Sequence, residues 1–399
     1  MSRSTLIASL ARNILTWSIF FALLELQVHG QNLTNSSRHG KLFSLFNVVT
    51  FNNGPCTGTG LPGSTAATGI CFTASECISL SGTTMGSCAS GFGVCCTFVL
   101  NSAGGGTVTQ NGTILQAPMS QTALADGMNI AYQVNRISSD VCFLRLDFQT
   151  FTILGPMDTL ETNGGQCVDT FTATTKTGTT TICGENSGEH IYVDFGMNPQ
   201  SMLTFNFGAT PGGTTIMRDW DIKVNQIPCT GPTAPPIGCL QYHTTLMGQI
   251  KSFNFDGNTG HLANQRYSAC IRQAADHCCV EFRVCPAPIM NAFTLDSTVG
   301  TTETACFTEL NPLTPSDIDY IGIAGSSSTC SMTQGIPTRN IYCGTTFNLL
   351  ATAPNAAVCD CTPPFAVDIV TDNTAGLQTV IPPTPFPRGV CLTYQQLMC

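Results

Sequence analysis

Cysteine is the residue type with the most chemistry to offer in this chain. The sequence contains 22 cysteines, an even number, and all of them follow residue 55. Thiols at this density either bind metal or pair as disulfides. The tightest clusters lack the spacing of a zinc site: Cys95-Cys96, Cys278-Cys279 and Cys359-Asp-Cys361. We therefore expect a disulfide framework and an oxidising, extracellular compartment.

The other reactive residue types form no catalytic motif. Among the 6 histidines no HExxH motif occurs, and no serine stands in a Gly-x-Ser-x-Gly or Gly-Asp-Ser-Gly-Gly loop. We interpret His190 beside Glu189, and His261 near Asp256, as surface pairs rather than catalytic dyads. A glycosidase-type pair of carboxylates from distant loops stays open as an alternative. The chain is predicted not to be an enzyme.

The N-terminus has the pattern of a secretory signal. Arg3 and Arg12 accompany an apolar run from Ile14 to Leu24, which is shorter than the roughly 20 residues that span a membrane. We expect a signal peptide over 1–30, a linker over 31–55, secretion, and no membrane span. Sequons that predict N-glycosylation stand at Asn32, Asn35 and Asn111.

The composition indicates strands and limits the partners. Charged residues make up 10% of the chain, against about 25% in an average globular domain. Thr, Ser, Asn and Gly supply the polar surface instead, and they favour strands and turns over helices. The net charge of −9 and the absence of a basic run argue against nucleic acid as a partner.

Hydrophobic alternation identifies the strands that must position any site. Apolar and polar residues alternate with period two, which is the pattern of a strand with one buried face. Gly- and Pro-rich turns separate these segments, so we expect an all-β protein built of β-sandwiches. The alternating segments are 144–148, 203–207, 220–224, 280–284 and 365–369.

Cysteine spacing and composition divide the chain into blocks. Residues 56–97 have too little apolar sequence for a core of their own and depend on disulfides. A Pro/Gly-rich linker at 230–238 separates a block at 98–229 from one at 239–399. With Cys229 in the second block every block has an even number of cysteines, and we favour this division. Placing it in the third block would demand a bridge between domains.

The block at 98–229 resembles a CUB domain, the extracellular antiparallel sandwich, jelly-roll-like in topology, of complement proteases and developmental proteins. The resemblance lies in Leu144-x-Leu146-x-Phe148-x-x-Phe151, in Cys167 followed by Asp169 and Phe171, and in Ile182-Cys183-Gly184. It implies a disulfide between Cys167 and Cys183. Cys142 is left unassigned, with Cys229 as its partner by count alone.

The block at 239–399 resembles a second, more divergent CUB domain. Its motifs follow in family order: Tyr267-Ser-Ala-Cys270, Tyr342-Cys343-Gly344 and Gly389-Val-Cys-Leu-Thr-Tyr394. The resemblance implies a disulfide between Cys239 and Cys270. The whole layout is similar to secreted arthropod proteins that carry paired CUB-type domains.

The first block resembles the arthropod clip domain. The resemblance lies in Gly69-Ile-Cys71, Cys77, Cys88 and Val94-Cys95-Cys96. The fold class expected for the whole chain is thus a clip-like disulfide module followed by two CUB-type sandwiches. The disulfides that the clip resemblance implies are Cys56–Cys95, Cys71–Cys88 and Cys77–Cys96.

Many CUB domains hold a calcium ion with three loop carboxylates, because a hard cation needs several oxygen ligands. In the first CUB-like block Leu154 stands at the first of these places, so the set is broken there. In the second, the resemblance assigns the places to Asp296, Asp319 and Asp372. Calcium is one interpretation of these residues; three solvated loop aspartates is the other.

Together these features predict a secreted, non-catalytic binding protein that engages extracellular protein or glycan ligands through its CUB-type domains. One alternative is a structural, disulfide-rich component of a matrix or cuticle. Another is a non-catalytic regulator of an extracellular protease cascade, which the clip-like resemblance alone suggests.

Overall fold

The computed structural model describes most of the chain after residue 49. The predicted signal peptide and the sequons at Asn32 and Asn35 lie outside the described residues. The part from Phe51 to Cys399 forms one unit, and no helix in its described residues is long and apolar enough to cross a membrane. The described residues are 50–58, 67–119, 124–156, 165–174, 178–210, 217–257, 259–295, 319–330, 340–348, 354–373 and 388–399.

The N-terminal module is a small antiparallel sheet with the strand order β1-β2-β4-β3 and one short helix. Thr73 begins the helix with a capping box, in which its hydroxyl accepts from the backbone N–H of Glu76. The elements are β1 (Pro55–Gly58), β2 (Ala67–Phe72), α2 (Ala74–Ser79), β3 (Thr83–Cys88), η1 (Ala89–Gly91) and β4 (Gly93–Thr97).

Disulfides stabilise this module, because its apolar core is small. Its apolar cluster is small and centres on Phe72 and Phe98, whose rings meet edge to face. The bonded pairs are those that the clip resemblance implies: Cys56–Cys95, Cys71–Cys88 and Cys77–Cys96.

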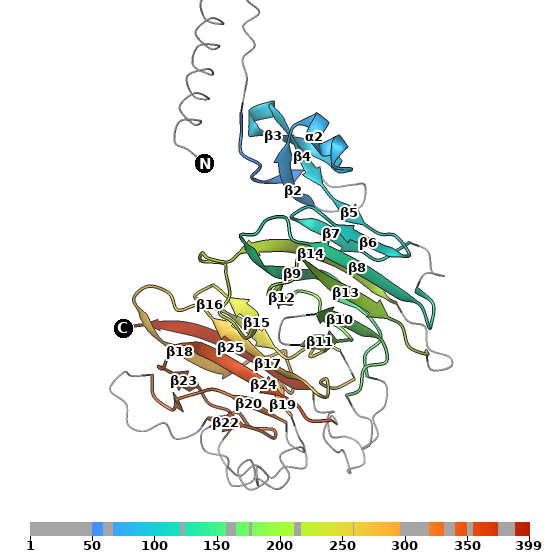
Figure 1. Ribbon diagram of the computed structural model, residues 1–399. Helices are drawn as coiled ribbons and strands as arrows, with labels where there is room; N and C mark the ends of the chain where they lie inside the picture. The colour runs from blue at the N-terminus through green and yellow to red at the C-terminus, as the bar shows by residue number, and fades with distance from the viewer. Residues whose placement is uncertain are drawn as a thin grey trace, which may run out of the picture. The chain divides into compact units, whose positions relative to one another are not determined.

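The next part of the chain forms a sandwich of two sheets, shown in green in Figure 1. One sheet has the strand order β11-β10-β13-β8-β6 and the other the order β12-β9-β14-β7-β5. The strands are β5 (Val99–Leu100), β6 (Gly105–Val108), β7 (Thr113–Gln116), β8 (Asn129–Asn135), β9 (Val141–Thr152), β10 (Thr170–Thr174), β11 (Thr179–Ile182), β12 (His190–Asp194), β13 (Gln200–Asn206) and β14 (Asp219–Pro228).

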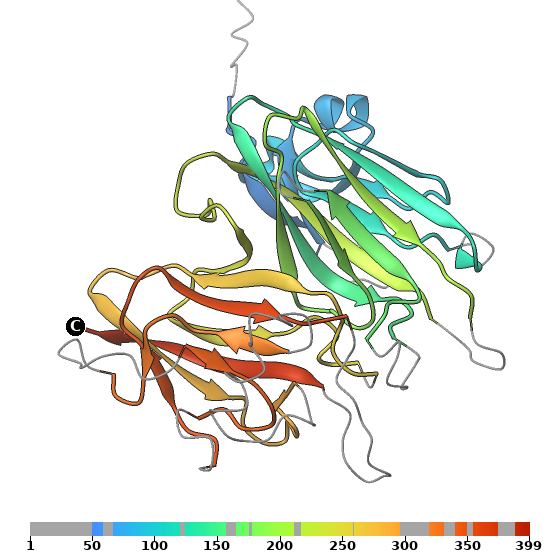
Figure 2. The ribbon, with the colours of Figure 1, turned by 60° about the horizontal axis from the view of Figure 1, so that its bottom comes forward.

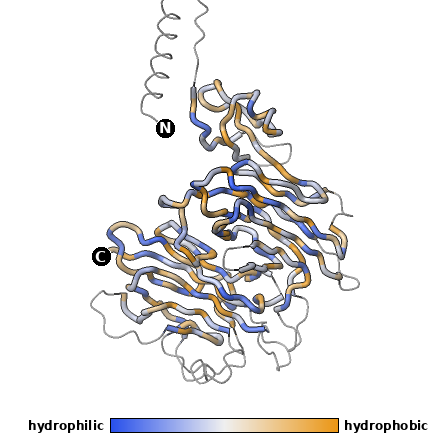
Figure 3. Tube along the Cα trace, viewed as in Figure 1, coloured by the Kyte–Doolittle hydropathy of each residue, from blue (hydrophilic) through white to orange (hydrophobic). Residues whose placement is uncertain are grey.

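The core of this first sandwich confirms the predicted alternation. Trp220 of β14 stacks on Phe205 of β13 with ring centroids 4.0 Å apart, so an aromatic pair joins the two sheets. Figure 3 shows hydrophobic and hydrophilic residues alternating along the strands. The apolar residues of 144–148 and 220–224 are buried in the core.

The C-terminal part forms a second sandwich, coloured yellow to red in Figure 2. Its sheets have the strand orders β15-β17-β24-β20-β22 and β16-β25-β18-β23-β21, and β19 pairs with β25. The strands are β15 (Cys239–His243), β16 (Met247–Lys251), β17 (Arg266–Ile271), β18 (His277–Val284), β19 (Phe293–Thr294), β20 (Tyr320–Gly322), β21 (Ser326–Ser327), β22 (Ile341–Tyr342), β23 (Val358–Asp360), β24 (Phe365–Val370) and β25 (Gly389–Met398).

One sheet has the same strand order in both sandwiches. The order β11-β10-β13-β8-β6 of the first corresponds strand for strand to β22-β20-β24-β17-β15 of the second. Both sheets are antiparallel except for one parallel pair at the same edge, β6 with β8 and β15 with β17. The loop before β10 and the loop before β20 are therefore equivalent places in the two sandwiches.

Every disulfide described in the sandwiches joins cysteines of one block. In the first sandwich Cys142 is bonded to Cys229, and Cys167 to Cys183. Cys306 lies outside the described residues. The pairs described in the second sandwich are Cys239–Cys270, Cys278–Cys399, Cys279–Cys361, Cys285–Cys391 and Cys330–Cys359.

Candidate functional site

A buried ion pair occupies one end of the first sandwich. Asp169 lies directly before β10 and Arg218 directly before β14, so the strand ends of the two sheets bring them together. Arg218 Nε lies 2.7 Å from Asp169 Oδ2, and Arg218 Nη2 lies 2.8 Å from Oδ1. The Arg218 side chain is 5% exposed and the Asp169 side chain 0%. The contact is thus a bidentate pair withdrawn from solvent.

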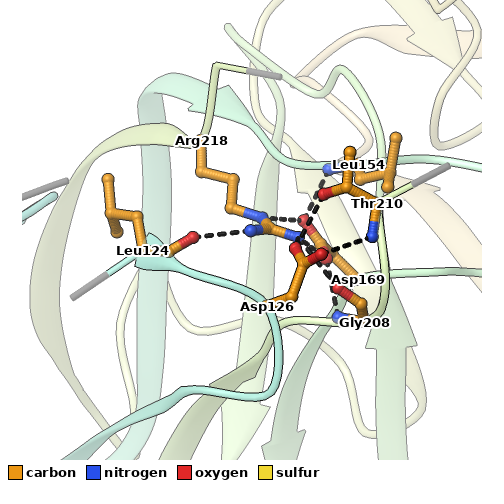
Figure 4. Close-up of polar contacts among 7 residues, drawn as sticks. All are labelled: Leu124, Asp126, Leu154, Asp169, Gly208, Thr210 and Arg218. Atoms are coloured by element: carbon orange, nitrogen blue, oxygen red, sulfur yellow. Dashed lines mark hydrogen bonds and ion pairs between the residues drawn. The ribbon is translucent and has the colours of Figure 1, made fainter. Parts of the chain in front are cut away.

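More oxygen atoms complete the surroundings of the Arg218 guanidinium (Figure 4). It donates to the carbonyl oxygen of Leu124 at 2.5 Å and to that of Gly208 at 3.1 Å, and Asp126 Oδ1 lies 3.0 Å from Nη2. Burial lowers the pKa of Arg218, but Asp169 and Asp126 outweigh it and raise the pKa above its usual value. The guanidinium is a permanent cation inside a cage of oxygen acceptors.

The equivalent place in the second sandwich holds a different ion pair. Asp319 lies directly before β20, and its Oδ2 lies 3.0 Å from Nε2 of His261, with both side chains 1% exposed. His261 Nδ1 faces the carbonyl oxygen of Leu262, and Nε2 also faces that of Leu295. Because both ring nitrogens face oxygen acceptors, the ring is assigned as an imidazolium.

The charge on His261 agrees with this geometry. Burial lowers its pKa, but the Asp319 carboxylate and the hydrogen bonds to the two carbonyls outweigh burial and raise the pKa to about 9. Asp319 Oδ2 makes no well-aligned hydrogen bond, so its contact with His261 is an ion pair at close range. A buried carboxylate is therefore neutralised by the protein's own cation in each sandwich.

Of the three residues assigned to calcium by resemblance, the structure describes Asp319 and Asp372. The backbone N–H of Asp372 donates to Asp319 Oδ1 at 2.8 Å, and Asp296 lies outside the described residues. Both Asp319 oxygens are engaged, one by this N–H and the other by the His261 cation, which repels a divalent ion. In this arrangement the described donors do not fit a calcium ion.

Asn254 links the two sandwiches. Its side-chain Oδ1 accepts from the backbone N–H of Glu185 at 3.0 Å, and its backbone N–H donates to Asn186 Oδ1 at 2.8 Å. Gly184 stands against it with φ of +78°, and a Cβ built there would lie 1.9 Å from Asn254 Oδ1. Only glycine meets both demands at this position.

The interpretation of His190 and Glu189 as a surface pair is wrong. His190 is buried where β12 packs on β15, and its Nε2 accepts from the backbone N–H of Tyr242 at 3.0 Å. Burial, with Arg145 and His243 nearby, lowers the pKa of His190 to about 3. Burial raises the pKa of Glu189 to about 7.

The interpretation of His261 and Asp256 as a surface pair is wrong as well. His261 is paired with Asp319, and Asp256 with Lys251 at 2.6 Å. Sequence reasoning also missed Arg218 and Asn254. The sequence does contain a signal for Arg218, which is a basic residue at the start of a predicted strand in a chain with few charges. The sequence around Asn254 contains no comparable signal.

Comparison with known proteins locates one family match. Residues 236–397 match the family model described as the animal CUB domain. No curated protein matches the chain.

Among solved structures, similarity extends to the CUB1-EGF-CUB2 domains of rat MASP-1, with 12% identity, coverage of 75% of this chain and 99% of that chain, and a TM-score of 0.21. The same domains of human MASP-1/3 have 12% identity, coverage of 68% and 94%, and a TM-score of 0.20. The full extracellular region of zebrafish Gpr126/Adgrg6 has 8% identity, coverage of 73% and 36%, and a TM-score of 0.24.

Proposed function

We propose that the protein is a secreted, non-catalytic binding protein that engages extracellular protein or glycan ligands through two CUB-type sandwiches. The observation that carries the proposal is the match of residues 236–397 to the animal CUB domain. The matching strand order of one sheet in the sandwich at 99–228 supports a second domain of the same kind. CUB domains are binding modules of extracellular proteins.

The proposed organisation follows the disulfide blocks. It consists of a signal peptide at 1–30, a linker at 31–55, a clip-like module at 56–97, CUB-type domains at 98–229 and 239–399, and a linker at 230–238. Glycosylation at Asn111 is part of the proposal. Its Oδ1 accepts from Gln226 N–H at 2.7 Å, which leaves the amide nitrogen, the atom that carries the sugar, out of this contact.

The buried titratable groups of the described residues support a structural rather than a catalytic role. Asp169 and Asp319 each form a buried ion pair with a cationic side chain, and His190 accepts a hydrogen bond from a backbone N–H. Catalytic acids and bases need access to a substrate, and these groups are buried in contacts within the protein.

Affinity capture from extracellular fluid tests the proposal. The tagged, secreted chain serves as bait, and the same chain after reduction and alkylation controls for non-specific adsorption. We expect a stoichiometric protein or glycoprotein partner with the oxidised bait only. Recovery of no partner, with the bait itself in the insoluble matrix, would favour a structural component. Recovery of a protease zymogen whose activation rate changes would favour a cascade regulator.

A further inference from the structure

A cavity lies between the two sandwiches in the described part of the chain. It has a volume of about 480 Å³, within the range of about 300–1,000 Å³ that ligand pockets occupy. One wall comes from β11 and the loop before β10, and the other from β15 and the segment 263–267. The walls are joined by two hydrogen bonds, from Ala263 N–H to Gly165 O and from Gln265 Nε2 to Thr181 O.

Arg266 is the charged residue in the lining of this cavity. Every other lysine and arginine among the described residues has an ion-pair or hydrogen-bond partner within the protein. The exposed Arg266 guanidinium has none, although the chain carries a net charge of −9. An unpaired guanidinium in a concave site is prepared to bind a carboxylate or a sulfate with two parallel hydrogen bonds.

The rest of the lining consists mainly of neutral hydrogen-bonding groups. The lining includes Thr179, Thr180 and Thr181 of β11, together with Gln166 and Asn264. Such groups match the hydroxyls of a sugar, whereas the anchor side chains of a peptide need apolar, well-packed pockets. The apolar side chains in the lining, Leu240, Ala263 and Tyr267, are themselves buried.

We infer that this cavity, named here the Arg266 groove, binds an acidic saccharide, with its carboxylate or sulfate on Arg266 and its hydroxyls on the threonines of β11. The inference rests on the proposed function and specifies the ligand class for one site. Neither sandwich forms the groove alone, so the site exists only in the two-sandwich protein.

Binding of defined oligosaccharides to the secreted full chain tests the inference. The probes are a hyaluronan tetrasaccharide for carboxylate, a heparin tetrasaccharide for sulfate, neutral chitotetraose, and hexaglutamate as an acidic peptide, each titrated by calorimetry. Arg266→Gln is expected to weaken binding of an acidic saccharide by at least about tenfold. Thr180→Val, which removes the hydroxyl of one lining residue, is expected to weaken it as well.

Arg283→Gln is the matched control. Arg283 belongs to β18 in the other sheet of the same sandwich, and its side chain is 60% exposed. Arg283→Gln removes one positive charge, as Arg266→Gln does, and is expected to leave saccharide binding unchanged. Equal melting temperatures for the three variants and the wild type show that the folds are intact.

The remaining outcomes overturn the inference in distinguishable ways. Acidic-saccharide binding that Arg266→Gln leaves unchanged would place the ligand elsewhere and keep the proposed function. Arg266-dependent binding of hexaglutamate without saccharide binding would make the groove a peptide site. Binding of neutral chitotetraose as tight as that of the acidic saccharides would show that the groove does not require an anionic group. Binding of none of the probes would refute the inference alone, because affinity capture tests the proposed function separately.

Discussion

Replacing Arg218 with methionine tests whether the buried ion pair stabilises the first sandwich. Methionine keeps an unbranched apolar chain of similar reach but removes the cation from the oxygen cage. Asp169 would then be left at 0% exposure, with only the backbone N–H groups of Leu154 and Gly208 to compensate its charge.

The expected loss follows from the burial of both partners. Breaking a buried ion pair on one side costs about 3–5 kcal/mol, because the remaining charge stays desolvated. With a urea dependence of about 2 kcal/mol per molar for a domain of this size, the unfolding midpoint falls by about 1.5–2.5 M.

Tryptophan fluorescence reports this transition selectively. The sequence has 2 tryptophans; Trp17 lies in the predicted signal peptide, and Trp220 is 1% exposed in the core of the first sandwich. The control is Arg283→Met, since Arg283 pairs with Glu281 at the surface. There a shift below about 0.5 M is expected. A midpoint for Arg218→Met as close to the wild type as that of the control would refute the reasoning.

Three further predictions concern the second sandwich and its link to the first. Millimolar calcium is expected to leave the melting temperature of the secreted chain unchanged, because His261 already neutralises Asp319; a rise with calcium would contradict this. The folded-state pKa of His261, raised from 6.5 to about 9, gives stability that is complete below pH 6.5 and is lost as the pH rises through about 9. Urea unfolding between pH 6 and 10 should show this loss in the wild type, and His261→Gln should flatten the profile. Gly184→Ala places a Cβ 1.9 Å from Asn254 Oδ1 at positive φ, so it should destabilise the link by at least about 1 kcal/mol; an unchanged melting temperature and unchanged proteolysis of the segment 230–238 would show that the link is dispensable.

The strands could be predicted from the sequence because the alternation of apolar and polar residues within each strand shows which of its faces is buried. Along β9 the residues 144–148 alternate between core and solvent, and the period of two is legible without knowing what the strand packs against. The alternation does not predict where a strand begins and ends. The alternating segment is 203–207, whereas β13 runs from Gln200 to Asn206. The expectation of an all-β protein with sandwiches was confirmed for the same reason.

The ion pairs and the link could not be predicted, because their partners meet only after folding. Asp169 and Arg218 stand 49 residues apart, and no pattern around either residue indicates the other. His190 was interpreted as part of a surface pair because Glu189 is its neighbour in sequence. Its burial comes from β15, a strand of the other sandwich.

The disulfides that close the sandwiches also determine how the protein transmits force. Cys142 stands at the start of β9 and Cys229 just after β14, and their bond spans 87 residues. Tension along the chain would pass through this bond. The bond would keep the enclosed segment from extending by roughly 300 Å, at about 3.4 Å per residue.

The bond between Cys278 and Cys399 does the same for 121 residues of the second sandwich. Under load, the oxidised protein would lengthen only in the segments outside these bonds. Reduction would release the sandwiches to unfold, so the redox potential of the surroundings would set the extensibility of the chain.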